Sequence, residues 1–175
     1  MTTRIEEMLQ ELEQEAQATR RVLARVPEDK LAWKPHEKSF SLGQLALHVA
    51  TLPGAIAQMS RQSPFPVPTF VQAAPATAAE LVPTFDASLA TARDTLRGMT
   101  DADLSQVWQM MDGDREMLAL PVGALLRTLM LNHVYHHRGQ LCVYLRQVDA
   151  LVPSVYGPSA DESPFVPGPE PVAQP

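Results

Sequence analysis

The sequence predicts an all-α fold, a four-helix bundle followed by a Pro-rich C-terminal tail. Four stretches of the chain carry apolar residues at the three-to-four residue spacing of an amphipathic helix. Prolines and turn-forming residues separate these stretches. At 175 residues the chain is long enough for one domain with a sizeable core. Four long helices in one domain of this size favour a bundle, which is an architecture that often builds metal sites from facing helices.

The first two helices are predicted over residues 3–26 and from Ser41 to about Met59. The first helix has an apolar face with Glu and Gln between its members, and it ends before Pro27. The second begins at Ser41-Leu-Gly-Gln44, a capping-box pattern in which the two polar side chains bond the free backbone N–H groups of the first turn. Residues 63–76 contain four prolines and predict a loop over the surface or across the mouth of a site.

The third and fourth helices are predicted over residues 77–98 and 121–148. Gly98 suits the end of the third helix, and Pro121 suits the first position of the fourth. The residues between them, which include the turn sequence Asp112-Gly-Asp114, carry no helical pattern and predict an irregular stretch.

The chain is expected to form one domain over residues 1–162 and a mobile, proline-rich tail over residues 163–175. Residues 153–175 contain seven prolines and no periodic element.

The charge and cysteine content exclude several classes of protein. The formal net charge is −6, and the fourteen lysines and arginines form no basic run, which argues against nucleic acid or an anionic membrane as a partner. The single cysteine, Cys142, excludes an intramolecular disulfide. The charged start is unlike a signal segment, and no apolar stretch approaches the roughly 18 residues of a membrane span. A cytoplasmic protein that acts on a small molecule is expected.

Three histidines are the candidate metal ligands. His133 and His137 are four residues apart, so they share one helical face and both rings can point at a common centre. His48 lies on the apolar stripe of the second helix. Taken alone it would be an ordinary core residue, but a third imidazole would complete a three-histidine set that leaves a divalent ion an open position. His136 is three residues from His133 and is assigned the role of a neighbour.

Other polar residues are weaker candidates. Gln140 returns to the histidine face one turn later, where it would hydrogen-bond a ligand ring or simply pack. Arg138 projects away from that face and predicts a salt bridge or an interface contact. Cys142 lies late in the helix and off the histidine face, so it is interpreted as a small buried hydrophobe rather than a nucleophile. Asp161 and Glu162 are left out of the site.

Three segments of the chain carry a family resemblance. They are residues 39–54 (SFSLGQLALHVATLPG), residues 131–140 (LNHVYHHRGQ) and residues 155–162 (VYGPSADE). Together they resemble the DinB-like (DinB/YfiT) metal-dependent enzymes over about residues 1–162. The resemblance implies a four-helix bundle of the DinB/YfiT-like type, often dimeric, with a divalent metal held by His48, His133 and His137. Relatives of this kind include transferases and isomerases that use low-molecular-weight thiols such as bacillithiol or mycothiol.

The functional hypothesis is therefore a metal-dependent enzyme, and a thiol-dependent S-transferase leads on the resemblance alone. The alternatives are a metal-dependent hydrolase and a non-catalytic metal or small-molecule binding module. Neutral imidazoles suit several divalent ions, of which zinc is the first choice and nickel the second. The long amphipathic helices and the family habit together predict a homodimer.

Overall fold

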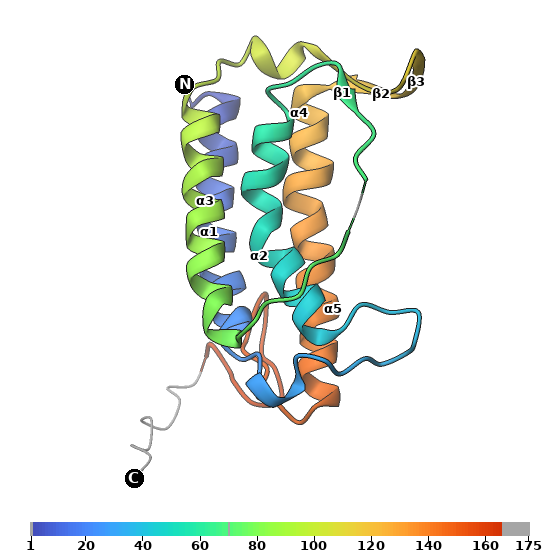
Figure 1. The fold of residues 1–175 in the computed structure, drawn as a ribbon. Helices are drawn as coiled ribbons and strands as arrows, with labels where there is room; N and C mark the ends of the chain where they lie inside the picture. Colours follow the sequence, from blue (N-terminus) through green and yellow to red (C-terminus); the bar gives the residue numbers. More distant parts are fainter. Residues whose placement is uncertain (1, 70, 166–175) are drawn as a thin grey trace.

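The structure is a computed structural model that describes residues 2–69 and 71–165. In these residues four long helical segments lie side by side (Figure 1). Three are the helices α1 (Arg4–Leu23), α2 (Leu42–Met59) and α3 (Leu81–Arg97). The fourth is continuous and consists of α4 (Val122–Leu125), the π-helical stretch η4 (Leu126–Asn132) and α5 (His133–Gln147). The four predicted helices are confirmed, and the fold is mostly helical.

Capping residues fix where the first two helices begin. In α1 the Thr3 hydroxyl accepts from the backbone N–H of Glu6, whose carboxylate accepts from the N–H of Thr3. Ser41 and Gln44 form the same reciprocal pair at the start of α2, as the sequence predicted. Each box satisfies two backbone donors that a helix start otherwise leaves unpaired. The capped start of α2 sets the position of His48, two turns further along.

The expectation of a purely all-α fold is wrong in one region, because the chain also forms a small sheet. Strands β2 (Val107–Asp112) and β3 (Arg115–Pro121) form an antiparallel hairpin, and β1 (Phe65–Pro66) pairs parallel to β2. Gly113 has a φ of +57° at the turn between β2 and β3, a conformation that glycine adopts without strain. The hairpin lies at the end of the bundle where α4 begins (Figure 1).

The sheet was not predicted from the sequence, because its strands lack the alternation of apolar and polar residues that is typical of a half-buried strand. Nearly every residue of β3 is exposed. Trp108 anchors the hairpin to the core, since it is completely buried and donates its indole N–H to the carbonyl of Met59 at 3.1 Å. The segment 63–76, which was predicted as a loop, contains strand β1 and connects the end of α2 to the sheet.

Helices α2 and α3 pack closely at Gly54. A Cβ atom at this position would lie 2.7 Å from the backbone oxygen of Ser88 on α3, so no larger residue fits without movement. The Ser88 hydroxyl accepts from the Gly54 N–H at 2.8 Å and donates to the carbonyl of Thr51 at 3.0 Å. Pro53, which lacks an N–H and lies inside α2, directly precedes this contact.

The segment after α5 packs back onto the helices. Asp161 pairs with Arg146 of α5, and Glu162 pairs with Arg21 of α1. Both carboxylates also accept backbone N–H groups of the same segment, from Val152 and Ser154. Residues 166–175, most of the predicted mobile tail, lie outside the described residues. Within the described part of the chain, no helix is both long enough and apolar enough to cross a membrane.

Candidate metal centre

His48 reaches the site from the buried stripe of α2. It lies between Leu45 and Leu52, which are both buried, and only 8% of the residue is exposed. The apolar stripe directs α2 toward the interior and packs it along the fourth helical segment. The ring of His48 therefore faces α5, although its position in the sequence is typical of a core residue.

His133 and His137 come from successive turns of α5. Their Nε2 atoms are 2.7 Å apart. The ring centre of His48 lies 5.3 Å from that of His133 and 4.7 Å from that of His137. One ring nitrogen from each histidine can be chosen so that all three lie within 4.8 Å of one another. The structure brings together the three residues that the sequence singled out, and among the described residues no other group of His, Cys, Asp or Glu has this geometry.

Gln140 fixes the tautomer of His137. Its side-chain oxygen lies 2.7 Å from Nδ1 of His137, and an amide oxygen can only accept. Nδ1 therefore carries the proton and Nε2 offers its lone pair to the centre of the cluster. In metal sites, hydrogen bonds of this kind, made by residues that do not bind the ion themselves, orient the histidine ligands. The hydrogen bond that the sequence suggested for Gln140 is confirmed.

Nδ1 of His133 is the buried side-chain polar atom that lacks a hydrogen bond in the described part of the chain. The carbonyl of Leu129, one turn earlier, favours a proton on His133 without reaching full hydrogen-bond geometry. In the cluster as it stands, His133 Nε2 must donate to His137 Nε2, which leaves Nδ1 bare. Moving that proton to Nδ1 would free both Nε2 lone pairs for one ion. The donor set therefore fits a metal better than it fits its own hydrogen bonding.

Burial keeps the three imidazoles neutral. It lowers the pKa of His48 to about 4, and the neighbouring His137 and His133 lower it further. Burial likewise lowers the pKa of His133 and of His137. A buried cation is costly, and three of them side by side would also repel one another. At neutral pH all three rings are thus in the form that binds metals.

Two neighbours complete the surroundings of the cluster. The ring of Phe40, just before the Ser41 cap, lies 6.0 Å from the ring of His48. Nothing in the sequence marked Phe40, because its place beside His48 depends on how the loop returns to α2. His136 is exposed, with its ring 4.8 Å from that of His137, so it borders the cluster as the spacing predicted.

The other candidate residues lie elsewhere. Arg138 is buried and pairs with Glu15 of α1, which confirms the predicted salt bridge. Cys142 is half-buried on another face of α5. Asp161 and Glu162 hold the C-terminal segment to the helices and take no part in the cluster, in agreement with their omission from the site. The π-helical stretch before His133 was not predicted, and such stretches occur frequently at functional sites.

The cluster supplies three neutral nitrogen donors and no carboxylate or thiolate. Zinc, nickel, iron and copper accept such ligands. Three protein ligands are also the number that catalytic zinc sites provide, which leaves a position for water or substrate.

Comparison of this sequence with known proteins finds a match to a protein family and to a curated relative. The sequence profile of the DinB family matches residues 1–170. A curated relative, the uncharacterised protein YrdA of Bacillus subtilis (strain 168), is 29% identical over 164 residues, covering 90% of this chain and 91% of the relative.

Solved structures show the same architecture. A DinB-like protein from Bacillus cereus ATCC 10987 is 27% identical, with a TM-score of 0.72 over 89% of this chain and 100% of the other. A DinB-like protein from Bacillus subtilis has 20% identity and a TM-score of 0.62, over 82% of this chain and 92% of its own. The latter likeness concerns the fold alone.

Proposed function

Because this chain belongs to the DinB family, we propose that it is a metal-dependent enzyme whose ion is bound by His48, His133 and His137. The proposal rests on one observation. Ring nitrogens of three neutral histidines, supplied by two helices, lie within 4.8 Å of one another. Thiol-dependent S-transfer to a small electrophile is the reaction we put first, by analogy with the relatives that the sequence resembles.

Each residue around the cluster has a distinct task in this proposal. Gln140 holds the proton of His137 on Nδ1, so that Nε2 remains a lone-pair donor. Burial of His48 keeps its ring neutral and limits the approach of water from the side of α2. Phe40 gives an apolar surface beside His48 against which the carbon part of a substrate would rest.

Zinc is the ion we propose first, and nickel is the second choice, since imidazole ligands suit both. When bound with an open position, such an ion lowers the pKa of a coordinated thiol or water and orients an electrophile.

Elemental analysis of the purified protein and of single alanine variants tests the ligand set. We expect one divalent ion per chain in the parent protein and loss of that ion on changing His48, His133 or His137. His36→Ala is the control, because His36 is exposed and outside the cluster. Full occupancy in the His133→Ala protein would overturn the assignment.

Turnover assays test the reaction. The zinc- and nickel-loaded protein is incubated with low-molecular-weight thiols and a panel of electrophiles, beside His137→Ala and Cys142→Ala. Thiol consumption that is lost in His137→Ala and retained in Cys142→Ala supports S-transfer. Ester or amide hydrolysis with the same dependence would replace transfer by hydrolysis. Metal binding without any turnover would leave a non-catalytic binding module.

We also propose that the protein is a homodimer, on the family habit and on the apolar residues that the chain exposes. On the hairpin, Val107 is 61% exposed, Met117 47% and Leu118 40%. Exposed apolar side chains of this size are candidates for a contact with a second chain. Sedimentation velocity at micromolar concentration should give the mass of two chains, and a single species of 19.2 kDa would refute the dimer.

A further inference from the structure

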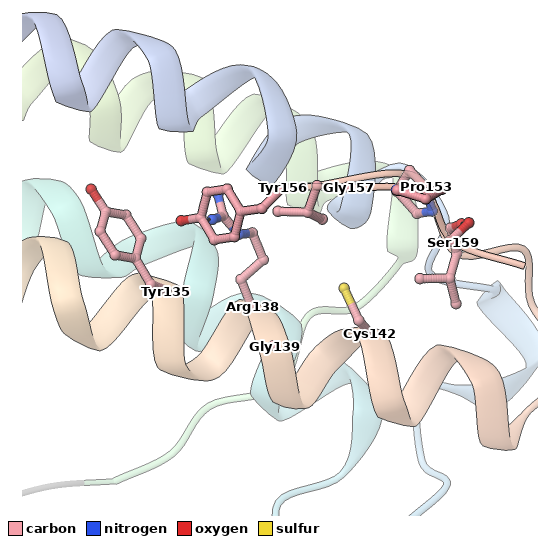
Figure 2. A pocket seen from close by; sticks show the side chains of 11 residues that line it. Tyr135, Arg138, Gly139, Cys142, Pro153, Tyr156, Gly157 and Ser159 are labelled. Carbon is pink, nitrogen blue, oxygen red and sulfur yellow. Dashed lines mark hydrogen bonds between the residues drawn. The ribbon is translucent and has the colours of Figure 1, made fainter. Parts of the chain in front are cut away.

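A cavity lies on the face of α5 that points away from His133 and His137. Cys142 follows His133 by nine positions, which is about half a turn around the axis at 3.6 residues per turn. The cavity has a volume of about 340 Å³ and lies between α5 and the returning segment 152–159 (Figure 2). Small-molecule sites begin at roughly 300 Å³. The space is sufficient for one small ligand.

The walls of this cavity are mainly apolar. Val152, Pro153, Val155 and Pro158 line it from the returning segment. From the opposite side, the sulfur of Cys142 points toward that segment (Figure 2). Burial raises the pKa of the Cys142 thiol, which is therefore neutral at pH 7 and behaves as a weakly polar wall.

Arg138 is the charged side chain among the lining residues, and its charge is already compensated. Its guanidinium donates to the Glu15 carboxylate at 2.6 Å, the Thr19 hydroxyl at 3.0 Å and the Tyr156 hydroxyl at 2.6 Å. The rings of Tyr135 and Tyr156 lie 5.4 and 5.1 Å from its central carbon. A charged ligand would have to lose its hydration without gaining an unpaired partner. The cavity therefore favours a neutral molecule.

Tyr156 gives the cavity a rigid aromatic surface. The residue is 71% exposed, yet its hydroxyl donates to Glu15 at 2.8 Å and accepts from Arg138. An exposed ring that is held at its far end can stack against a ligand with little loss of side-chain entropy.

Gly139 opens the cavity from the side of the helix. It lies in the middle of α5, and a Cβ atom built on it would meet nothing within 4 Å. No contact within the described chain requires glycine at this position, although glycine is the poorest helix former after proline. Gly139 lines the cavity, and the space that a side chain would occupy there is open.

We propose that this cavity binds a small, neutral, largely apolar molecule with an aromatic ring, which stacks on Tyr156 and enters past Gly139. The site uses the face of α5 opposite His133, so this proposal does not depend on the metal centre.

The single thiol of the chain provides the test, because maleimides can label only Cys142. Labelling rates are measured with N-ethylmaleimide and N-benzylmaleimide, which share the reactive group and differ in the aromatic ring. Rates with glutathione give the intrinsic preference between the reagents. The protein should prefer the benzyl reagent by about two- to twelve-fold more than glutathione does, the range that one aromatic contact provides. Benzyl alcohol should slow the labelling competitively.

Gly139→Leu fills the entrance, and Val143→Leu is its matched control, since Val143 is exposed one turn further along α5 and outside the lining. Circular dichroism and urea unfolding confirm that both variants are folded. The benzyl preference should fall to the glutathione value in Gly139→Leu and persist in Val143→Leu. A preference equal to that of glutathione in the parent protein, or one unchanged by Gly139→Leu, would overturn the site.

Discussion

Changing Arg138 to methionine should cost about 3 kcal/mol of folding free energy. The side chains of Arg138 and Glu15 are only 2% and 13% exposed, so their ion pair is largely withdrawn from water. Removing one partner of a buried pair costs roughly 3–5 kcal/mol, because the other charge stays behind unpaired. The lower end applies here, since Glu15 keeps some contact with solvent and a hydrogen bond from Tyr156. For a chain of this length the loss corresponds to a decrease of about 6–12 °C in Tm.

Thermal and urea unfolding of three variants separate the ion pair from simple packing. Arg138→Met leaves the Glu15 carboxylate buried without a partner. Arg138→Lys keeps the positive charge but loses the forked geometry, so it should lose less folding stability. Adding Glu15→Leu to Arg138→Met removes the unpaired carboxylate and should recover most of the stability. The reasoning is refuted if Arg138→Met loses less than about 1 kcal/mol, or if the double variant is no more stable than the single one.

Three further predictions concern the metal centre, the C-terminal segment and the packing of α2. Gln140→Ala should weaken metal affinity about 10- to 100-fold in chelator competition. Gln140→Glu keeps an acceptor for His137 and should retain most of the affinity. Equal affinity in the parent and both variants would contradict the role of Gln140 in orienting His137. Arg146 and a backbone N–H lower the pKa of Asp161. Its stabilising effect is therefore complete above the unfolded pKa of about 3.9 and is lost as the pH falls through the lower folded value. Urea midpoints between about pH 5 and pH 2 should thus fall more steeply for the parent than for Asp161→Asn, and parallel curves would refute this. Gly54→Ala should destabilise the fold by about 1–3 kcal/mol, because its Cβ would meet the backbone of α3; an unchanged urea midpoint would refute this.

Local spacing accounts for the parts of the site that the sequence predicted. His133, His137 and Gln140 lie on one helix, where the positions i, i+4 and i+7 share a face whatever the rest of the fold does. The capping box at Ser41 similarly fixed the start of α2 from four consecutive residues. The approach of His48 is different in kind, since it depends on α2 packing along α5. The residues suggested this approach through the apolar stripe, and the family resemblance implied it.

The parts that were missed depend on contacts between segments far apart in the chain. Phe40 reaches His48 through the course of a loop, and Trp108 anchors the hairpin through a carbonyl 49 residues away. A Pro-Gly pair such as Pro53-Gly54 indicates a helix interruption when it is considered locally. In the structure the significance of Gly54 lies in the absent side chain, which admits the backbone of α3.

The π-helical stretch η4 explains why helical periodicity misplaced part of the last helix. At 3.6 residues per turn, Leu126, Leu129 and His133 would share one face of the helix, but Leu129 is only half-buried, while Met130 and Leu131 are buried. Bonds from residue i to i+5 wind the helix less per residue than ordinary α-helical bonds do. Seven residues of this winding rotate everything that follows relative to the start of the helix. The direction in which His133 and His137 face α2 is therefore set by η4, upstream of the histidines themselves, and a count based on 3.6 residues per turn cannot detect it.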